Sequence, residues 1–331
     1  MKKLVFKFFC KSFVLLLLPL VTILAFGCRG SVTGNLIVEE SNKPIEAYFC
    51  PKDDCGKILE NEIRNANASA HCAFYDLDLR NVVDALSKKS KSADIRVIMD
   101  NTNNDGQIKG SSVRFDDSNQ LMHNKFCVID KRIMITGSFN PTDNDNNYNN
   151  NNIIIIYSKI LAENYEDEFD ELWNGKFGEG SKVKYPKVSL SEVSIENYFC
   201  PEDECAQRVI GLINNAEKSV YFMAFSFTNE KIADAVIKKG NLDVKGIFDS
   251  GQASSQYSQY RRMEEFGINV IKDKNRRKMH HKVFIIDNET VVTGSFNPTK
   301  NADARNDENV IVVHDKKIAK SYLDEFESLW Q

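Results

Sequence analysis

The hydrophobic positions of residues 197–331 fall into two alternating kinds of segment. Apolar residues recur every three or four positions in the segments that we predict to be amphipathic helices, at 206–216, 229–239, 257–266 and 318–330. Short, continuously apolar runs lie between them and predict strands buried on both faces, at 219–226, 242–248, 283–286 and 310–313. This alternation predicts an α/β fold, in which a mainly buried mixed sheet carries helices on its faces.

The first half of the chain repeats this pattern, because the sequence is duplicated. Three segments recur in the same order and at the same spacing. They are YFCPKDDC at 48–55 and YFCPEDEC at 198–205, TGSFNPT at 136–142 and 293–299, and DEF followed by LW at 167–173 and 324–330. A conserved order of this kind predicts the duplication of a whole domain.

The repeats define the domain boundaries that we expect. Domain 1 covers residues 45–174 and domain 2 covers residues 197–331. Residues 175–196 carry Gly, Ser, Lys and Pro without periodicity and are interpreted as a linker, as are residues 29–44. A chain of 331 residues has room for two such domains, and 42% hydrophobic residues suffice for a core. The net charge of -4 excludes a strongly basic nucleic-acid coat protein.

The N-terminus has the layout of a secretory signal. Lysines precede an apolar run at 13–26 that is short for a membrane-spanning helix. The run ends at Ala25-Phe26-Gly27-Cys28, which resembles a bacterial lipoprotein cleavage site, although Phe26 is bulkier than the usual residue. We therefore expect residues 1–28 to be a signal with Cys28 as a candidate for lipidation, or else an uncleaved membrane anchor. Both predict export to the bacterial cell envelope and membrane association through the N-terminus.

Export changes how the cysteines are interpreted, because disulfides persist in oxidising compartments. Cys50 and Cys55 form a C-x4-C pair, and Cys200 and Cys205 form its copy. We expect each pair to close a small disulfide. A zinc site is the alternative, but zinc usually needs four ligands and no histidine lies nearby at a suitable spacing. Two further cysteines lie inside apolar runs and are predicted to be buried thiols, Cys72 and Cys127.

Each repeat contains one strongly polar motif. The first has His123-x-Lys125-x4-Asp130, the second has His280-x-Lys282-x4-Asp287, and Gly-Ser-Phe-Asn follows seven residues after each Asp. Residues two apart on a strand share a face, so His and Lys project together. Cleavage of a phosphodiester needs a nucleophile, a proton donor for the leaving alkoxide and cations for the phosphoryl oxygens. Two histidines and two lysines supply these groups.

These motifs resemble the signature of the phospholipase D superfamily, and the resemblance covers nearly all of both repeats. It implies that the two domains pack as a pseudo-twofold pair around one active site, so that a monomer acts as an internal pseudo-dimer. It implies a phosphodiesterase that forms a covalent phosphohistidine and needs no metal or cofactor. The hydroxyl and amide groups of the Gly-Ser-Phe-Asn segments are expected to bind phosphate, from Ser138, Asn140, Ser295 and Asn297. Asp130 and Asp287 should face away and act structurally.

One departure from symmetry divides the two histidines. The superfamily often has a carboxylate, within N-x-E-N, that hydrogen-bonds the histidine of the partner motif. Glu308 matches it in the second repeat, whereas Asn151 stands at the equivalent position of the first. By that resemblance, Glu308 orients His123 as the nucleophile and His280 is the general acid.

Other polar features are expected to be structural. The Asn-rich stretch 140–152 is interpreted as a low-complexity loop. His71 and His314 are expected to be satisfied core residues, and strand alternation should turn His281 away from the site. The basic residues at 272–278 either guide an anionic substrate or form a solvated loop.

The substrate is the question that the motifs leave open. The second repeat looks most like the small bacterial endonucleases of the superfamily, and repeats of this size leave little room for lipid-binding loops, so a nucleic-acid substrate is slightly favoured. Phospholipase D activity, by hydrolysis or head-group transfer, is the close alternative for an exported protein. An inactive phosphate-binding or nucleic-acid-binding protein is the third hypothesis, which the two intact His-Lys pairs disfavour.

Overall fold

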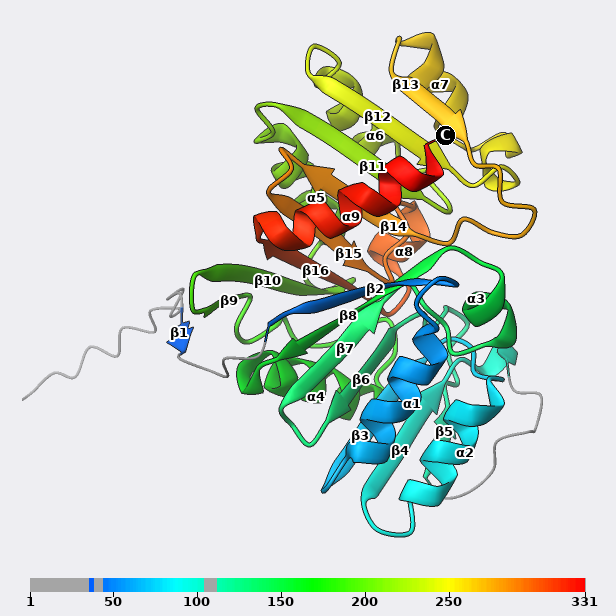
Figure 1. The fold of residues 1–331 in the computed structure, drawn as a ribbon, viewed down its shortest axis with the longest axis vertical. Helices are drawn as coiled ribbons and strands as arrows, with labels where there is room; N and C mark the ends of the chain where they lie inside the picture. The colour runs from blue at the N-terminus through cyan, green and yellow to red at the C-terminus, as the bar shows by residue number, and fades with distance from the viewer. Residues whose placement is uncertain (1–35, 39–43, 104–111, 331) are drawn as a thin grey trace, which may run out of the picture. The chain divides into compact units, whose positions relative to one another are not determined.

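Each repeat of the chain builds its own β-sheet (Figure 1). The structure is a computed structural model that describes residues 36–38, 44–103 and 112–330. The predicted signal 1–28, with Cys28, and most of the predicted linker 29–44 lie outside the described residues.

The first sheet has seven strands, and the second sheet repeats their order. The first sheet runs β2 (Glu46–Cys50), β8 (Asn151–Tyr157), β7 (Ile133–Gly137), β6 (Lys125–Ile129), β3 (Ser69–Phe74), β4 (Asp94–Met99) and β5 (Val113–Phe115). The second runs β10 (Val193–Cys200), β16 (Glu308–His314), β15 (Thr290–Gly294), β14 (Lys282–Ile286), β11 (Ser219–Ala224), β12 (Asp243–Phe248) and β13 (Asn269–Lys272). Beyond β10 it continues through β9 (Lys187–Leu190) to β1 (Leu36–Val38).

Both sheets are mixed, as predicted. The three strands β3, β4 and β5 pair in parallel, as do β11, β12 and β13, whereas the motif strands β6 and β14 pair antiparallel to their neighbours. Parallel strands need a crossover connection, and the helices predicted from the apolar periodicity supply it. The predicted α/β class is therefore confirmed.

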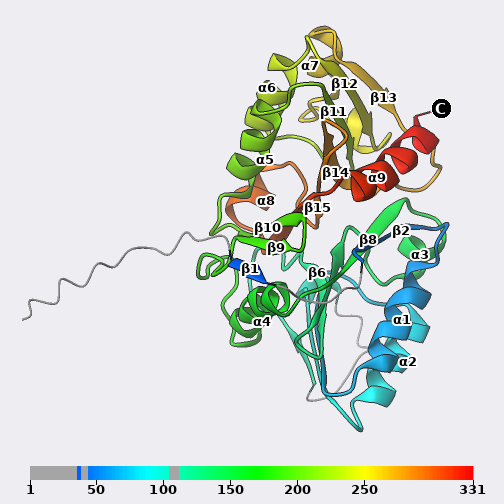
Figure 2. The same ribbon diagram turned by 60° about the vertical axis from the view of Figure 1, so that its left-hand side comes forward.

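The helices form layers on both sides of the sheets (Figure 2). α1 (Cys55–Asn65) and α2 (Arg80–Lys89) pack with the first sheet, and α5 (Cys205–Asn214) and α6 (Glu230–Lys238) pack with the second. α4 (Lys159–Trp173) and α9 (Lys316–Leu329) enter a third core that both sheets share. The remaining short helices are η1 (Asn101–Asn103), α3 (Asp143–Asn147), η2 (Gln252–Ser254), α7 (Tyr260–Glu265) and α8 (Lys300–Ala304). Among the described residues, none of the helices combines the length and hydropathy needed to cross a membrane.

The two long inner helices begin at matching side-chain caps. The Ser158 hydroxyl accepts a hydrogen bond from the Leu161 amide at the start of α4, and the Asp315 carboxylate accepts one from the Ile318 amide at the start of α9. Such caps satisfy amides that have no partner inside the helix. They fix where each helix leaves its strand and turns towards the shared core.

Two stretches that we expected to be irregular carry regular structure. The predicted linker 175–196 contains β9 and the first residues of β10, because Val188 and Ile195 are buried in the shared core. The Asn-rich stretch 140–152 is not a low-complexity loop, since it forms α3 and starts β8. Its asparagines are hydrogen-bonded inside the protein, which periodicity could not indicate.

The cysteines form one more disulfide than expected. Cys50 pairs with Cys55 and Cys200 with Cys205, in agreement with the C-x4-C spacing. Cys72 and Cys127, expected to be buried thiols, are also paired with each other. They lie directly opposite one another on the antiparallel strands β3 and β6, a register that only the sheet creates.

One buried asparagine in each repeat hydrogen-bonds polar groups of the other repeat. The Asn309 amide donates to Asn124 Oδ1 at 2.9 Å, and its oxygen accepts from the hydroxyls of Thr136 and Tyr165 in the other repeat. At the equivalent place, the Asn152 amide donates to His281 Nδ1 at 3.0 Å. Its oxygen accepts from the hydroxyls of Thr293 and Tyr322. Each asparagine is fully buried, so the other repeat replaces the water that both amides lose.

We expect Asn152→Ala to lower the free energy of unfolding by about 3 kcal/mol. The truncation removes the asparagine partner of two buried hydroxyl groups and of His281 Nδ1, and each unsatisfied buried group costs about 1–3 kcal/mol. Urea unfolding followed by circular dichroism measures this loss. Asn147→Ala, at an exposed position of α3, is the control and should stay within about 0.5 kcal/mol of the parent. Equal stability of both variants would contradict the interface described here.

Candidate active site

The two motif histidines lie at the junction of the repeats, just before β6 and β14. The His123 amide donates to the carbonyl of Asp307 at 2.9 Å, and the His280 amide donates to the carbonyl of Asn150 at 2.8 Å. Both bonds cross from one repeat to the other. The backbone of each motif is therefore held by the opposite repeat, and one shared site results.

Both imidazoles line a single cavity of about 340 Å³. Each is 7% exposed. The wall of the cavity is completed by aromatic, amide and charged side chains, among them Tyr75, Asp76, Asp78, Asn140, Asp145, Phe225, Lys278 and Asn297. A phosphodiester that enters it meets both histidines at once.

His123 is held by the carboxylate that the sequence singled out. Glu308 Oε2 lies 2.8 Å from His123 Nδ1 and accepts a hydrogen bond from the Ser295 hydroxyl at 2.7 Å. Glu308 therefore contacts Nδ1 of His123 and leaves Nε2 without a contact to this carboxylate. Burial raises the pKa of Glu308 to about 8, and the nearby Lys125 and Lys282 ammonium groups oppose that rise. Burial, followed by the same two lysines, lowers the pKa of His123 well below its usual value.

His280 has a different partner set. Its Nδ1 lies 2.9 Å from Asn151 Oδ1, the position where the first repeat lacks the acid. Asp145 Oδ2 lies 3.4 Å from the same nitrogen. Burial and the Lys282 charge lower the pKa of His280, and the Asp145 carboxylate opposes this effect.

The two motif lysines are buried and begin the strands β6 and β14 that follow the histidines. Lys125 Nζ donates to the His123 carbonyl at 2.8 Å, and Lys282 Nζ donates to the His280 carbonyl at 2.7 Å. An aromatic ring lies beneath each ammonium group, Tyr75 for Lys125 and Phe225 for Lys282. Burial lowers the pKa of Lys125 to about 8. Burial, and then the charge of Lys125, lowers the pKa of Lys282 well below its usual value.

The serines of the Gly-Ser-Phe-Asn segments hydrogen-bond neighbouring groups of the site. The Ser138 and Ser295 hydroxyls accept from the amides of Asn152 and Asn309, and Ser295 donates to Glu308. Neither serine is among the residues that line the cavity, and Lys125 and Lys282 are not among them either.

The asparagines of these segments do reach the cavity. Asn140 Nδ2 donates to Asp145, whereas the side-chain oxygens of Asn140 and Asn297 are buried without a hydrogen-bond partner in the structure. A buried polar atom of this kind is costly unless a ligand or water satisfies it.

The glycine of each segment permits a close backbone approach. Gly137 and Gly294 have φ values of 146° and 132°. A Cβ atom on them would lie 2.2 Å from the Asn152 carbonyl oxygen and 2.3 Å from that of Asn309. Only glycine fits this contact, which keeps β8 close against β7 and β16 close against β15.

The motif aspartates lie away from the cavity. Asp130 accepts backbone hydrogen bonds from Asn67, Ala68 and Ser69, at the start of β3. Asp287 accepts the equivalent bonds at the start of β11, from Glu217, Lys218 and Ser219. Each aspartate thus fixes the strand that pairs with its own motif strand.

The other histidines have protein partners. His281 points away from the cavity and lies 3.3 Å from Glu325, and His71 is buried against Glu166. His314 is half-exposed at the end of β16, beside Thr290 and Glu196, and so is not the core residue that we expected.

Sequence reasoning missed Asp145, Tyr75 and Phe225. Asp145 was hidden inside the Asn-rich stretch, and an ungapped alignment of the repeats could have revealed it, since it stands opposite Ala302. The two rings follow β3 and β11 at matching positions of the repeats. Only the assembled site shows that Tyr75 contacts His123 and that Phe225 contacts His280, each edge to face at 4.8 Å.

Comparison with known proteins agrees with this architecture. The family model described as "Cardiolipin synthase, PLD-like domain" matches residues 59–173 and 209–330, once in each repeat. A phospholipase D of Rickettsia felis is 33% identical over 162 residues, which are 47% of this chain and 81% of that protein. A mitochondrial cardiolipin hydrolase of Chlamydomonas reinhardtii is 36% identical over 125 residues, 37% of this chain and 56% of that protein.

A solved structure extends the likeness to both repeats together. Phosphatidylserine synthase of Haemophilus influenzae aligns with 88% of this chain and 87% of that chain, with a TM-score of 0.61 at 14% identity, which shows the fold. The family model covers more than half of the chain, and both His-x-Lys motifs fall within it. The protein therefore belongs to the family of PLD-like domains and is a phosphodiesterase of the phospholipase D superfamily.

Proposed function

We propose that the protein hydrolyses the head-group phosphodiester of phospholipids. The observation that carries this proposal is the charge of the cavity wall. Asp76 and Asp78 line it together with Tyr75 and Phe225, and Lys278 is the lysine that joins them. A polyanion needs a continuous basic track, whereas a single phosphodiester with an uncharged or cationic head group tolerates carboxylates beside it. Relatives named phospholipase D and cardiolipin hydrolase support the same substrate class.

The first chemical step of the proposed mechanism uses the free nitrogen of His123. Its Nε2 attacks phosphorus, the P–N bond forms, and the P–O bond to the head group breaks. His280, as the imidazolium, gives its proton to the departing alkoxide. Glu308 Oε2 at 2.8 Å favours the Nδ1–H tautomer of His123 and stabilises the positive charge that it acquires. The ammonium groups of Lys125 and Lys282 balance the charge on the non-bridging oxygens.

The second step reverses the proton transfer. Neutral His280 takes a proton from water, the resulting oxygen nucleophile attacks phosphorus, and the P–N bond breaks to release His123 and the phosphatidate. Both steps use the same two imidazoles, so no further residue has to move into the cavity. An alcohol in place of water gives head-group transfer by the same route.

A nucleic-acid substrate is the second candidate. The observation that favours it is the basic segment 272–278, which reaches the cavity through Lys278. The same two steps would then release a free hydroxyl at one end of a cleaved strand. Direct comparison of the two substrates separates the candidates.

We also propose that the protein acts at the bacterial cell envelope. The basic and apolar N-terminal segment and the cysteine at position 28 support export, and paired cysteines fit an oxidising compartment. An envelope enzyme lies beside its phospholipid substrate. Cys28→Ser should move the protein from the membrane fraction to the soluble fraction of disrupted cells, which immunoblotting measures. An unchanged distribution would instead assign an uncleaved anchor.

Phosphatidylcholine vesicles and single-stranded DNA, each incubated with the protein in EDTA, test the substrate. We expect choline release without DNA cleavage, and a fall of about 10³-fold or more in His123→Ala and His280→Ala, since each variant loses a reacting group. His314→Ala is the control histidine variant and should keep full activity. Mass spectrometry of the quenched reaction should find phosphohistidine at His123.

Three results would overturn parts of this proposal. Cleavage of DNA alone would assign a nuclease. Loss of activity in EDTA would contradict the metal-independent mechanism, and a phosphohistidine at His280 would reverse the roles of the two histidines.

The pH dependence of kcat/KM should include the titration of Lys125. Its pKa is lowered to about 8 by burial, so it is cationic below that pH and loses its charge above it. We expect kcat/KM to fall as the pH rises through about 8, because the free enzyme then binds the phosphodiester anion less well. Glu308, whose pKa burial raises to about 8, titrates in the opposite sense, since its carboxylate is the active form. It contributes an ascending limb over the same range, so kcat/KM should pass through a narrow maximum near pH 8.

Lys125→Arg tests the assignment of the descending limb, because the guanidinium stays charged at high pH. The limb should move upward in this variant, and Lys131→Arg, at an exposed position, should leave it unchanged. A limb that stays near pH 8 in Lys125→Arg would assign it to another group.

A further inference from the structure

We propose that Asp145 is the positioning carboxylate of His280. The second repeat carries this acid at position 308, whereas the first repeat carries one at position 145 instead, so that each imidazole has one carboxylate. The inference rests on the proposed histidine mechanism and deepens it, since it assigns the group that makes His280 an effective acid.

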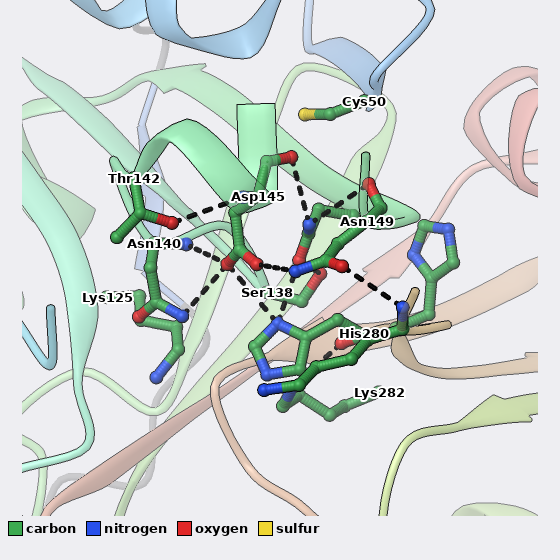
Figure 3. A network of polar contacts seen from close by, with 12 residues as sticks. Cys50, Lys125, Ser138, Asn140, Thr142, Asp145, Asn149, His280 and Lys282 are labelled. Carbon is green, nitrogen blue, oxygen red and sulfur yellow. Dashed lines mark hydrogen bonds and ion pairs between the residues drawn. The ribbon is translucent and has the colours of Figure 1, made fainter. Parts of the chain in front are cut away.

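The geometry places Asp145 directly beside His280 (Figure 3). Asp145 Oδ2 lies 3.4 Å from His280 Nδ1, and Asn151 Oδ1 lies 2.9 Å from the same nitrogen. Asn151 therefore accepts the N–H and fixes the tautomer. An amide carries no net charge, however, and cannot balance an imidazolium. Asp145, whose carboxylate lies beside the same nitrogen, supplies the negative charge.

The two repeats differ at two equivalent pairs of positions. In an ungapped alignment, Asp145 stands opposite Ala302 and Asn151 stands opposite Glu308. Each repeat therefore has one carboxylate and one uncharged residue at these two places, in opposite order. Both carboxylates reach the Nδ1 of the histidine in the other repeat. An accidental buried aspartate would not be expected to compensate for the missing acid in this way.

Asp145 is held in a site built for an anion. It is 4% exposed. Its Oδ2 accepts from the Asn140 backbone and side-chain amides, both at 2.9 Å, and its Oδ1 accepts from the Asn149 side chain at 2.6 Å (Figure 3). These donors and the His280 charge keep the pKa of Asp145 below its usual value against the effect of burial.

The charges around His280 explain why a carboxylate is needed. Lys282 and Lys125 both disfavour an imidazolium at this position, and burial disfavours it further. Lys278 also lines the cavity, while Asp76 and Asp78 lie on the same wall and oppose the lysines. Asp145 is the acid in contact with the imidazole. Without it, the imidazolium that donates to the leaving group would be disfavoured still further.

The decisive comparison uses two diesters that differ in their demand for a proton. The first is phosphatidylcholine or single-stranded DNA, whichever the parent protein cleaves, because both release a basic alkoxide. The second is bis(p-nitrophenyl) phosphate, whose leaving group departs without help from an acid. We expect Asp145→Asn to lower kcat on the first about 10²-fold, and to change kcat on the second less than about threefold.

A double variant provides the rescue. Asp145→Ala with Asn151→Glu gives the first repeat the arrangement that the second repeat already has. We expect it to recover kcat on the first substrate to within about tenfold of the parent. Asp143→Asn, an exposed position of the same helix, is the control and should match the parent on both substrates. Thermal unfolding of each variant checks that it is folded.

The outcomes separate this inference from the proposed function. Equal losses of Asp145→Asn on both substrates, or no loss on either, would overturn the role of Asp145 while leaving the phosphodiesterase mechanism in place. Failure of the rescue in a folded double variant would also count against a role of Asp145 equivalent to that of Glu308. A parent protein that cleaves none of the three diesters would overturn the mechanism and the inference together.

Discussion

The site depends on hydrogen bonds between the repeats, which occur in matching pairs, one in each direction. Asn152 and Asn309 each satisfy the buried polar groups of the opposite repeat, and the backbone amides of His123 and His280 each donate to a carbonyl across the junction. Buried amides without partners are costly, so neither repeat can bury this face alone. The same bonds that join the two sheets also set the separation and orientation of the two imidazoles.

Within this frame the two halves of the site have diverged. His123 has a glutamate on its Nδ1, whereas His280 has an amide at 2.9 Å and an aspartate at 3.4 Å. In the proposed mechanism His123, the nucleophile, must be neutral before attack, whereas His280, the general acid, must carry a proton. Duplication supplied two equivalent histidines, and substitutions at four positions around them allow their protonation to differ.

Electrostatics limits what this site can bind. Two buried lysines lie beside two buried imidazoles. Burial, and after it the charges of both lysines, lowers the pKa of His123, and burial and the Lys125 charge lower the pKa of Lys282. Buried carboxylates of Glu308 and Asp145 offset part of that positive charge, and a phosphodiester anion offsets more. In the proposed function, the aspartates on the cavity wall oppose a long polyanion and leave room for a single phosphodiester. Substrate binding and site stability are therefore coupled through charge.

The sequence alone determined the duplication, the α/β class and the two His-x-Lys pairs. These features are local or periodic: each motif is a short run of sequence, and repeated segments can be recognised without a structure. The tertiary structure decided the rest. Asp145 is far in sequence from His280, and Cys72 meets Cys127 through strand register. Ser138 and Ser295 turned out to hold their neighbours because Asn152 and Asn309 occupy their hydroxyls. Contacts between residues distant in the chain depend on how sheets and loops pack, and no local pattern encodes them.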